Sequence, residues 1–385
     1  MDDELDGREE QEASGPKKLY IIRSTLAMLT TIALVAGGLL AFIYRDYLSK
    51  ESLRGIFSGD KTVSSDGEPF TYENGSNQTF ALAGDGLAVA SGSGIQLLDE
   101  SGREVFSRVT SMENPAVSAC RTLALFYDVG GSTCVAAGFD GSSRIIDAGQ
   151  SIISGSVNAS GYFTLISEES GSRGLVHVYD SSCRELYRWY AGTGWPVKAL
   201  VSPDNRRLAV LCVTNEGSAI VLFRLDSEDE QARILYPGIL LFDMCFMSGS
   251  RLCAIGEQGV YFAGTDGTQT AQYGFDGQHL IAYDLGGTSF AALYTSPYRA
   301  GGGTLVTLDE DGNVLGSVQP ESGISALSAA GRRLLAVTSG GISLYSQALE
   351  ARGSESGLIT AKAALLRPKG DVLLLSSYFA QIHTF

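Results

Sequence analysis

The chain has 385 residues, of which 47 are Gly, 44% are hydrophobic and 18% are charged, and its formal net charge is −15. It is too apolar and too weakly charged to be disordered throughout. With seven Lys and 43 acidic against 28 basic residues, it also lacks the cationic face that general nucleic-acid binding requires. Abundant Gly with few charges favours many tight turns, and therefore a β-rich protein.

Residues 1–23 form the first distinct segment. They contain seven acidic and four basic residues and few apolar ones. Such a segment cannot bury enough surface to fold, so we expect a disordered acidic tail.

Ser24–Tyr44 is a run of 21 residues without a charge. As a helix it would be about 31 Å long, which matches the roughly 30 Å hydrocarbon core of a bilayer. A buried helix of a soluble domain and a cleaved signal peptide are the alternatives. The second is disfavoured because the run is long and Phe42–Arg45 offers no small-residue cleavage site. We predict an uncleaved single-pass transmembrane helix, a signal anchor.

The orientation of this segment follows from weaker signals, because basic residues are nearly balanced on its two sides. The tail is short, and a large C-terminal domain translocates largely regardless of its charge. We therefore expect a cytoplasmic N-terminus at the cell membrane, a stalk or linker over residues 45–65, and an extracytoplasmic domain over 66–385.

Residues 66–385 carry an internal repeat. A turn followed by a bulky apolar residue and then by small or β-branched residues recurs eight times, at spacings of 36 to 45 residues. The mean spacing of about 41 lies in the range of propeller blades. The apolar anchor residues are Leu87, Leu123, Phe163, Leu208, Leu252, Phe290, Leu334 and Val372.

A second phrase in the repeat is an Asp-rich turn between apolar runs, as in Leu98–Val105, Tyr179–Leu186 and Leu308–Leu315. Asp caps such a turn and Gly supplies the positive φ. Each unit therefore reads as four short strands. Helical solenoids lack this strand pattern, and a β-sandwich does not require a repeat of about 41 residues. We therefore predict an all-β β-propeller.

Blade number follows from the two ends of the repeat. The last unit stops at Phe385 after three strands, and Glu68–Tyr72 is an unassigned strand-like piece before the first unit. We predict that this piece supplies the missing outer strand, which gives eight four-stranded blades. Seven blades is the alternative.

No catalytic or metal-binding constellation is evident. The chain has no G-x-S-x-G motif, and its three histidines are scattered (His177, His279 and His383). Asp309–Asn313 lacks the spacing of a calcium loop and coincides with a repeat turn. We predict no catalytic residues, no bound metal and no cofactor.

The six cysteines contain no C-x-x-C pair, which argues against zinc and thioredoxin-like sites. Cys245 and Cys253 flank a turn centred on Gly249, so a symmetric hairpin would place them opposite one another. A disulfide between them is one possibility in an oxidising compartment. Free core cysteines are the other.

Two loops carry residues suited to recognition. Tyr190–Pro196 joins two units, and Ser296–Gly303 lies between the second and third strands of the sixth unit. In a propeller these two kinds of loop open on the same face. Trp195, Tyr298 and Arg299 are therefore candidate ligand-binding residues. The alternative for Trp195 is packing between neighbouring blades.

Val201–Val210 resembles the Ser-Pro-Asp turn of many WD40-like and lactonase-like propellers, although the chain has no Trp-Asp dipeptide. The whole plan of acidic tail, single apolar segment, stalk and Gly-rich propeller, with phrases such as Gly94–Leu98, Gly259–Phe262 and Gly341–Tyr345, resembles the bacterial family DUF5711. This resemblance implies an extracytoplasmic propeller of uncharacterised function and transfers no catalytic residue.

These observations favour a membrane-anchored binding or scaffold module whose partner is a protein or a cell-envelope polymer. One alternative is an extracytoplasmic enzyme that acts on a glycan through carboxylates at the channel mouth. The other is a single-pass sensor whose short tail would have to recruit a signalling partner. Nucleic acid is not an expected partner.

Overall fold

The computed structural model describes residues 69–287, 289–298, 302–357 and 361–385. The predicted tail, transmembrane helix and stalk lie outside these ranges. Within the described ranges, no helix has the length and apolarity that crossing a membrane requires.

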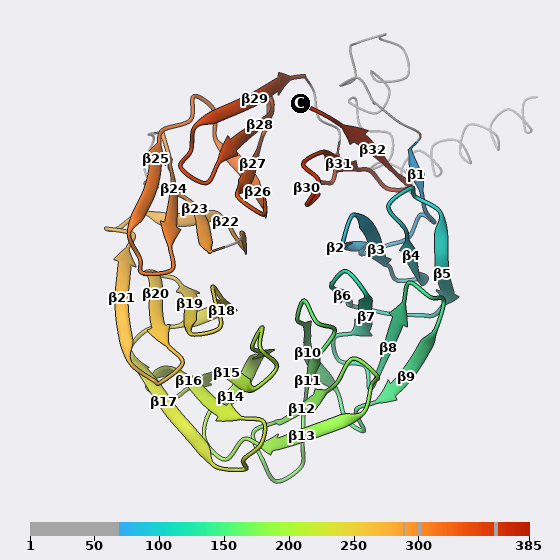
Figure 1. The fold of residues 1–385 in the computed structure, drawn as a ribbon, viewed down its shortest axis with the longest axis vertical. Helices are drawn as coiled ribbons and strands as arrows, with labels where there is room; N and C mark the ends of the chain where they lie inside the picture. The colour runs from blue at the N-terminus through green and yellow to red at the C-terminus, as the bar shows by residue number, and fades with distance from the viewer. Residues whose placement is uncertain (1–68, 288, 299–301, 358–360) are drawn as a thin grey trace, which may run out of the picture. The chain divides into compact units, whose positions relative to one another are not determined.

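The described residues form eight four-stranded antiparallel sheets arranged as the blades of a propeller (Figure 1). We label the strands of each blade A to D, from the centre of the ring to its rim. Blade 1 consists of β2 (Thr79–Ala83), β3 (Gly86–Ala90), β4 (Gly94–Leu98) and β5 (Glu104–Val109), and blade 2 of β6 (Pro115–Ala119), β7 (Leu123–Asp128), β8 (Thr133–Gly138) and β9 (Ser143–Asp147). Blade 3 consists of β10 (Ile152–Val157), β11 (Phe163–Ser167), β12 (Leu175–Tyr179) and β13 (Glu185–Tyr190), and blade 4 of β14 (Trp195–Val201), β15 (Arg207–Thr214), β16 (Gly217–Arg224) and β17 (Glu230–Pro237). Blade 5 consists of β18 (Leu241–Phe246), β19 (Arg251–Gly256), β20 (Gly259–Gly264) and β21 (Gln269–Gly274), and blade 6 of β22 (His279–Gly287), β23 (Phe290–Ser296), β24 (Thr304–Asp309) and β25 (Val314–Val318). Blade 7 consists of β26 (Ile324–Ala330), β27 (Arg333–Thr338), β28 (Gly341–Ser346) and β29 (Ala351–Ser356), and blade 8 of β30 (Ala363–Leu366), β31 (Val372–Leu375), β32 (Phe379–His383) and β1 (Phe70–Thr71).

The predicted repeat coincides with the blades. Every anchor residue is the first or second residue of a B strand, and all eight are buried. The B and C strands are buried on both faces by the neighbouring blades, whereas D strands such as β5 are mostly exposed. This burial explains why the B strands read as continuous apolar runs rather than as alternating ones.

The N-terminal strand closes the ring, as predicted. β1 pairs antiparallel with β32, with Phe70 opposite Ala380 and Thr71 opposite Phe379. The last blade thus combines three strands from the C-terminal end with one from the N-terminal side of the propeller. Eight blades is correct and seven is wrong.

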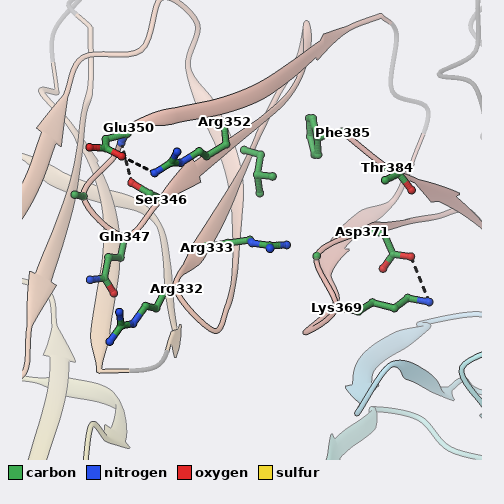
Figure 2. A pocket seen from close by; sticks show the side chains of 13 residues that line it. Arg332, Arg333, Ser346, Gln347, Glu350, Arg352, Lys369, Asp371, Thr384 and Phe385 are labelled. Carbon is green, nitrogen blue, oxygen red and sulfur yellow. Dashed lines mark hydrogen bonds and ion pairs between the residues drawn. The ribbon is translucent and has the colours of Figure 1, made fainter.

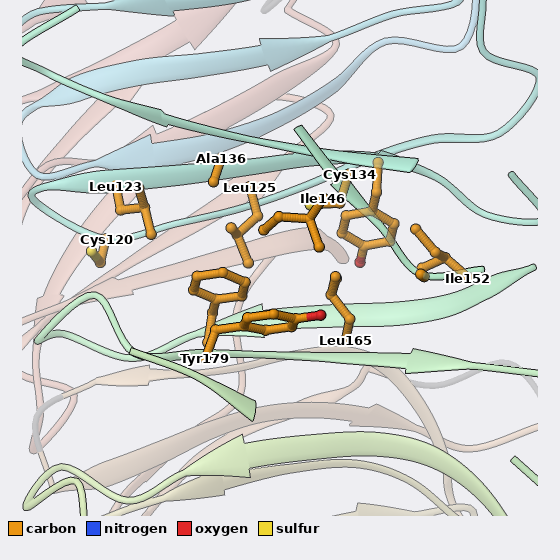
Figure 3. Packing of buried hydrophobic residues seen from close by; sticks show 12 residues of the cluster. Cys120, Leu123, Leu125, Cys134, Ala136, Ile146, Ile152, Leu165 and Tyr179 are labelled. Atoms are coloured by element: carbon orange, nitrogen blue, oxygen red, sulfur yellow. The ribbon is translucent and has the colours of Figure 1, made fainter. Parts of the chain in front are cut away.

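Apolar side chains fill the space between neighbouring blades. Figure 3 shows the cluster between blades 2 and 3, where Leu125 and Cys134 face Leu165 and Tyr179. Tyr179 stacks on Phe163 with ring centroids 4.8 Å apart. Each blade supplies half of two such clusters, which is why the sheets are stable only as a ring.

The Asp-rich phrases form the turns between C and D strands. In the first blade, Asp99 Oδ1 accepts hydrogen bonds from the backbone amides of Ser101 and Arg103, and Gly102 has a φ of +81°. Asp180 and Asp309 make the same pairs of bonds in blades 3 and 6. The backbone amides and side chains that bind these three carboxylates outweigh their partial burial and hold their pKa values below the ordinary value.

Candidate functional site

The loops that join D to A strands and B to C strands open on one side of the ring, because the strands of each blade alternate in direction. We call this side the DA/BC face. The A–B and C–D turns form the opposite side, the AB/CD face. The described DA/BC loops are 72–78, 91–93, 110–114, 129–132, 148–151, 168–174, 191–194, 215–216, 238–240, 257–258, 275–278, 297–298, 302–303, 319–323, 339–340, 357, 361–362 and 376–378.

The structure places two of the three predicted ligand-binding residues on the DA/BC face. Trp195, the first residue of β14, leaves 46% of its surface exposed, more than packing between blades would leave. The guanidinium carbon of Arg173 lies 4.0 Å from its ring centroid. Tyr298 is 79% exposed, and its ring lies 4.5 Å from that of His279. Arg299 lies outside the described residues, and ligand binding by all three stays a prediction.

Further exposed aromatic and apolar side chains share this face, among them Tyr190, Leu240 and Tyr378. Tyr190 ends β13, Leu240 precedes β18, and Tyr378 lies in the loop between β31 and β32. The sequence analysis placed Tyr190 in a candidate recognition loop without predicting it to bind a ligand, and it did not identify Leu240 or Tyr378. A signal was available for Leu240 and Tyr378, because each is a large apolar residue at a loop position where the other blades have small or polar residues. Exposed aromatic side chains on one rigid face are typical of recognition surfaces.

The DA/BC face is also acidic. Its described loops hold eight carboxylates, Glu73, Glu113, Glu168, Glu169, Glu216, Glu257, Asp276 and Glu321, and two cationic residues, Arg173 and Lys362. A surface with electrostatic potential of one sign attracts partners whose surface has the opposite sign.

A polar cluster links the inner strands of blades 4, 5 and 6. Asp243 on β18 forms an ion pair with Lys198 on β14 and accepts a hydrogen bond of 3.0 Å from the hydroxyl of Tyr283 on β22. Sequence reasoning missed it, although the signal was present, because these residues are 45 and 40 positions apart, which is one repeat. The cluster ties three blades together.

Asp284 is the second inner-strand acid in this region. It accepts hydrogen bonds from the backbone amides of Gly286 and of Ala329 in the next blade. Burial, with a smaller contribution from Asp243, raises its pKa to about 6. Both acids therefore have partners within the ring wall, and the enzymatic alternative gains no open carboxylate pair from them.

Asp284 gives the protein a testable pH dependence. Its pKa is higher in the folded than in the unfolded chain, so its contribution to stability is complete below about pH 4 and falls as the pH rises towards 6. Asp284→Asn cannot ionise, and we expect it to gain about 2 kcal/mol of stability relative to the unmodified chain between pH 4.5 and 7.5. Urea denaturation at both pH values measures this difference, and parallel pH profiles of the two proteins would refute it.

Cys245 and Cys253 are directly opposed in the β18–β19 hairpin. Both are free thiols here, as are the other four cysteines. The adjacent Cys245 thiol and burial raise the pKa of Cys253, which makes it a poor nucleophile. The disulfide between them stays a prediction.

The other candidate chemistries gain no support among the described residues. No group of three or more His, Cys, Asp or Glu side chains there could hold a metal ion. Asp309–Asn313 is the C–D turn of blade 6. In it, the Asp309 carboxylate accepts hydrogen bonds from the backbone amides of Asp311 and Asn313 and from the side-chain amide of Asn313. His177 is buried, with Nδ1 2.7 Å from a Glu185 oxygen, and is therefore a packed strand histidine.

Comparison with known proteins gives one family and a set of similar folds. Residues 61–350 match the family described as "Family of unknown function (DUF5711)". No curated protein matches the chain.

Solved structures with a similar fold include propeller domains of low sequence identity. The Cps50 (Swd1) β-propeller domain of Myceliophteria thermophila is 11% identical with a TM-score of 0.50, and 70% of this chain covers 94% of that one. The C-terminal WD40 domain of Sif2 is 9% identical with a TM-score of 0.58, and 85% of this chain covers all of it. A structure titled as the eukaryotic initiation factor is 10% identical with a TM-score of 0.52, at coverages of 85% and 92%. At these identities the likeness concerns the fold.

Proposed function

Since this chain belongs to the DUF5711 family, whose function is unknown, we propose a function from its own geometry: a membrane-anchored propeller that binds a protein through its DA/BC face. The observation that carries the proposal is the set of exposed aromatic and apolar residues on that face, Tyr190, Trp195, Leu240, Tyr298 and Tyr378. A rigid ring presents them without a large entropic cost of ordering.

The charge of the face specifies the chemistry of the partner. The described loops of this face hold eight carboxylates and two cationic side chains, which favours a protein surface rich in Lys and Arg, because like-charged surfaces repel. Aromatic side chains also accept guanidinium and ammonium groups through cation–π contacts. Arg173 already makes such a contact with Trp195.

The location belongs to the same proposal. The uncharged segment Ser24–Tyr44 would anchor the chain in the cell membrane, with residues 1–23 in the cytoplasm and the propeller outside. The propeller's WD40-like fold supports a non-enzymatic scaffold role.

Site-specific photocrosslinking in intact cells tests the proposal. A photoreactive residue replaces Tyr298 on the DA/BC face or, as the control, Glu228 in a turn of the AB/CD face. We expect position 298 to give a discrete protein adduct that Trp195→Ala weakens and whose crosslinked peptide is basic, whereas position 228 gives none.

Several outcomes would overturn it. Equal adducts from both positions, or none from position 298, would refute the DA/BC face as the docking surface. A glycan adduct in place of a protein would favour the cell-envelope polymer instead. An adduct with a cytoplasmic protein would contradict the extracytoplasmic location.

A further inference from the structure

A second surface feature lies on the opposite, AB/CD face, between blades 7 and 8. It is a pocket of about 940 Å³. The β26–β27 turn and the start of β27 supply Arg332 and Arg333, the β28–β29 turn and β29 supply Glu350 and Arg352, and the β30–β31 turn supplies Lys369 to Asp371 (Figure 2). We call it the seam pocket. Its volume is in the range of small-molecule sites.

The end of the last strand forms one wall of the seam pocket. Phe385 follows β32, and its ring lies against Gly353 of β29, where a Cβ atom would come within 2.7 Å of it. The described part of the outer strand β1 pairs only with Phe379 and Ala380, so it does not run beside the end of β32 that reaches the pocket.

The pocket is cationic although the chain is acidic. Four of its lining side chains are Arg or Lys and two are acids. Glu350 pairs with Arg352 at 2.6 Å. Asp371 binds the buried Arg367 through both oxygens and lies 3.4 Å from Lys369. Each acid is thus paired with a lining cation, Glu350 with Arg352 and Asp371 with Lys369, and Asp371 also with Arg367.

Arg332 and Arg333 have no such partner. Among the described residues, no carboxylate lies within ion-pairing distance of either guanidinium. Both side chains line the pocket, although their guanidinium groups point in different directions (Figure 2). An unpaired guanidinium group provides a fixed fork of N–H donors, and phosphate oxygens match such a fork bidentately.

Gly370 positions one of these donors. The guanidinium of Arg333 extends from blade 7 to the turn of blade 8 and lies over Gly370, where a Cβ atom would fall 1.5 Å from Nη1 (Figure 2). Gly370 also has a φ of +106°. The turn therefore needs Gly both for its backbone conformation and for the space that Arg333 fills. Arg333 and Lys369 consequently reach the same pocket from two different blades.

We propose that the seam pocket binds a phosphate-bearing anion through Arg332, Arg333 and Lys369. The site is separate from the DA/BC face and does not depend on the proposed protein partner. The phosphate belongs either to a soluble compound or to an anionic lipid headgroup, and these two sources share the same recognition chemistry.

Calorimetric titration of the full chain with pyrophosphate, at constant ionic strength, tests the site. We expect saturable binding that the double variant Arg332→Gln/Arg333→Gln weakens by roughly tenfold or more, because the variant loses both charge-assisted hydrogen-bond donors. Arg121→Gln is the matched control, because Arg121 is an exposed arginine in another A–B turn of the same face. It should bind pyrophosphate as the unmodified chain does.

Two results would overturn the proposal. One is the absence of saturable binding. The other is an equal loss of affinity in the Arg121 variant, which would indicate general charge attraction. Far-UV circular dichroism of each variant shows whether the ring is intact. If the double variant is misfolded, Lys369→Gln, whose side chain is 45% exposed, provides the second test with the same expected direction.

Repeating the titration in nanodiscs distinguishes the two sources of phosphate. A lipid headgroup would compete, so the apparent affinity for pyrophosphate would be lower in phosphatidylglycerol than in phosphatidylcholine discs, and the double variant would not show this difference. A soluble ligand predicts the same affinity in both. Either result is compatible with the site itself.

Discussion

Replacing Arg367 with Met is expected to lower the free energy of unfolding by about 3–5 kcal/mol, the usual cost of breaking a buried ion pair. Arg367 lies in the β30–β31 turn and is fully buried. It pairs with Asp371 and donates hydrogen bonds to the carbonyls of Asp85 and Glu100 in blade 1, at 3.0 and 3.2 Å. Met fills a similar volume but leaves Asp371 and both carbonyls without this donor.

The same side chain also contacts the closing strand, because its guanidinium carbon lies 5.4 Å from the ring centroid of Phe70. Arg367 therefore connects the β30–β31 turn of blade 8 both to the closing strand β1 of the same blade and to blade 1. The urea midpoint of the full chain, followed by circular dichroism, measures the effect.

Arg184→Met is the matched control. Arg184 pairs with Asp180 at the same spacing of four residues, but its side chain is 76% exposed. Exposed ion pairs contribute about 0–1 kcal/mol, so this variant should unfold close to the unmodified chain. Equal midpoints for the Arg367 and Arg184 variants would contradict the role of Arg367 in ring closure.

Replacing Phe70 with Ala is expected to cost about 3–5 kcal/mol, as for other buried aromatic residues. Phe70 is fully buried in β1 and packs with Leu87 and Leu98 of blade 1 and Leu373 of blade 8. Gly102 of blade 1 also lies against its ring, where a Cβ atom would come within 2.6 Å. Because β1 contributes only two residues, loss of this anchor should release the strand from β32.

Hydrogen exchange distinguishes loss of closure from general destabilisation. We expect amides of β32 to exchange faster in Phe70→Ala, while blades 3 to 5 keep their protection. Thr71→Ala is the control, since Thr71 is the exposed residue of the same strand. A uniform increase of exchange over all blades would show that Phe70 does not act through the closure.

The sequence could predict the ring because each blade buries the same few positions. The eight anchor residues are core residues, and the strand count at the two ends predicted the closure by residues 68–72. The C–D turns could also be predicted, because each depends on a few neighbouring residues, as the turns at Asp99, Asp180 and Asp309 show. At one of these turns, Cys183 adopts the positive φ that Gly takes elsewhere.

The seam pocket could not be predicted in this way. It depends on side chains of two blades, Arg333 and Phe385, and on the close approach of Arg333 to Gly370, and a periodic pattern specifies none of these. The Lys198–Asp243–Tyr283 cluster lies between these cases. Its members occupy equivalent inner-strand positions, so aligning the repeats by polar as well as apolar residues would have found it.

The central claim is that the DA/BC face binds a basic protein, and hydrogen exchange of the full chain with and without its crosslinked partner tests it most directly. We expect protection in DA/BC loops such as 191–194, 275–278 and 376–378, and unchanged exchange in the C–D turns 99–103, 180–184 and 225–229. Protection of the C–D turns with unchanged DA/BC loops would contradict it.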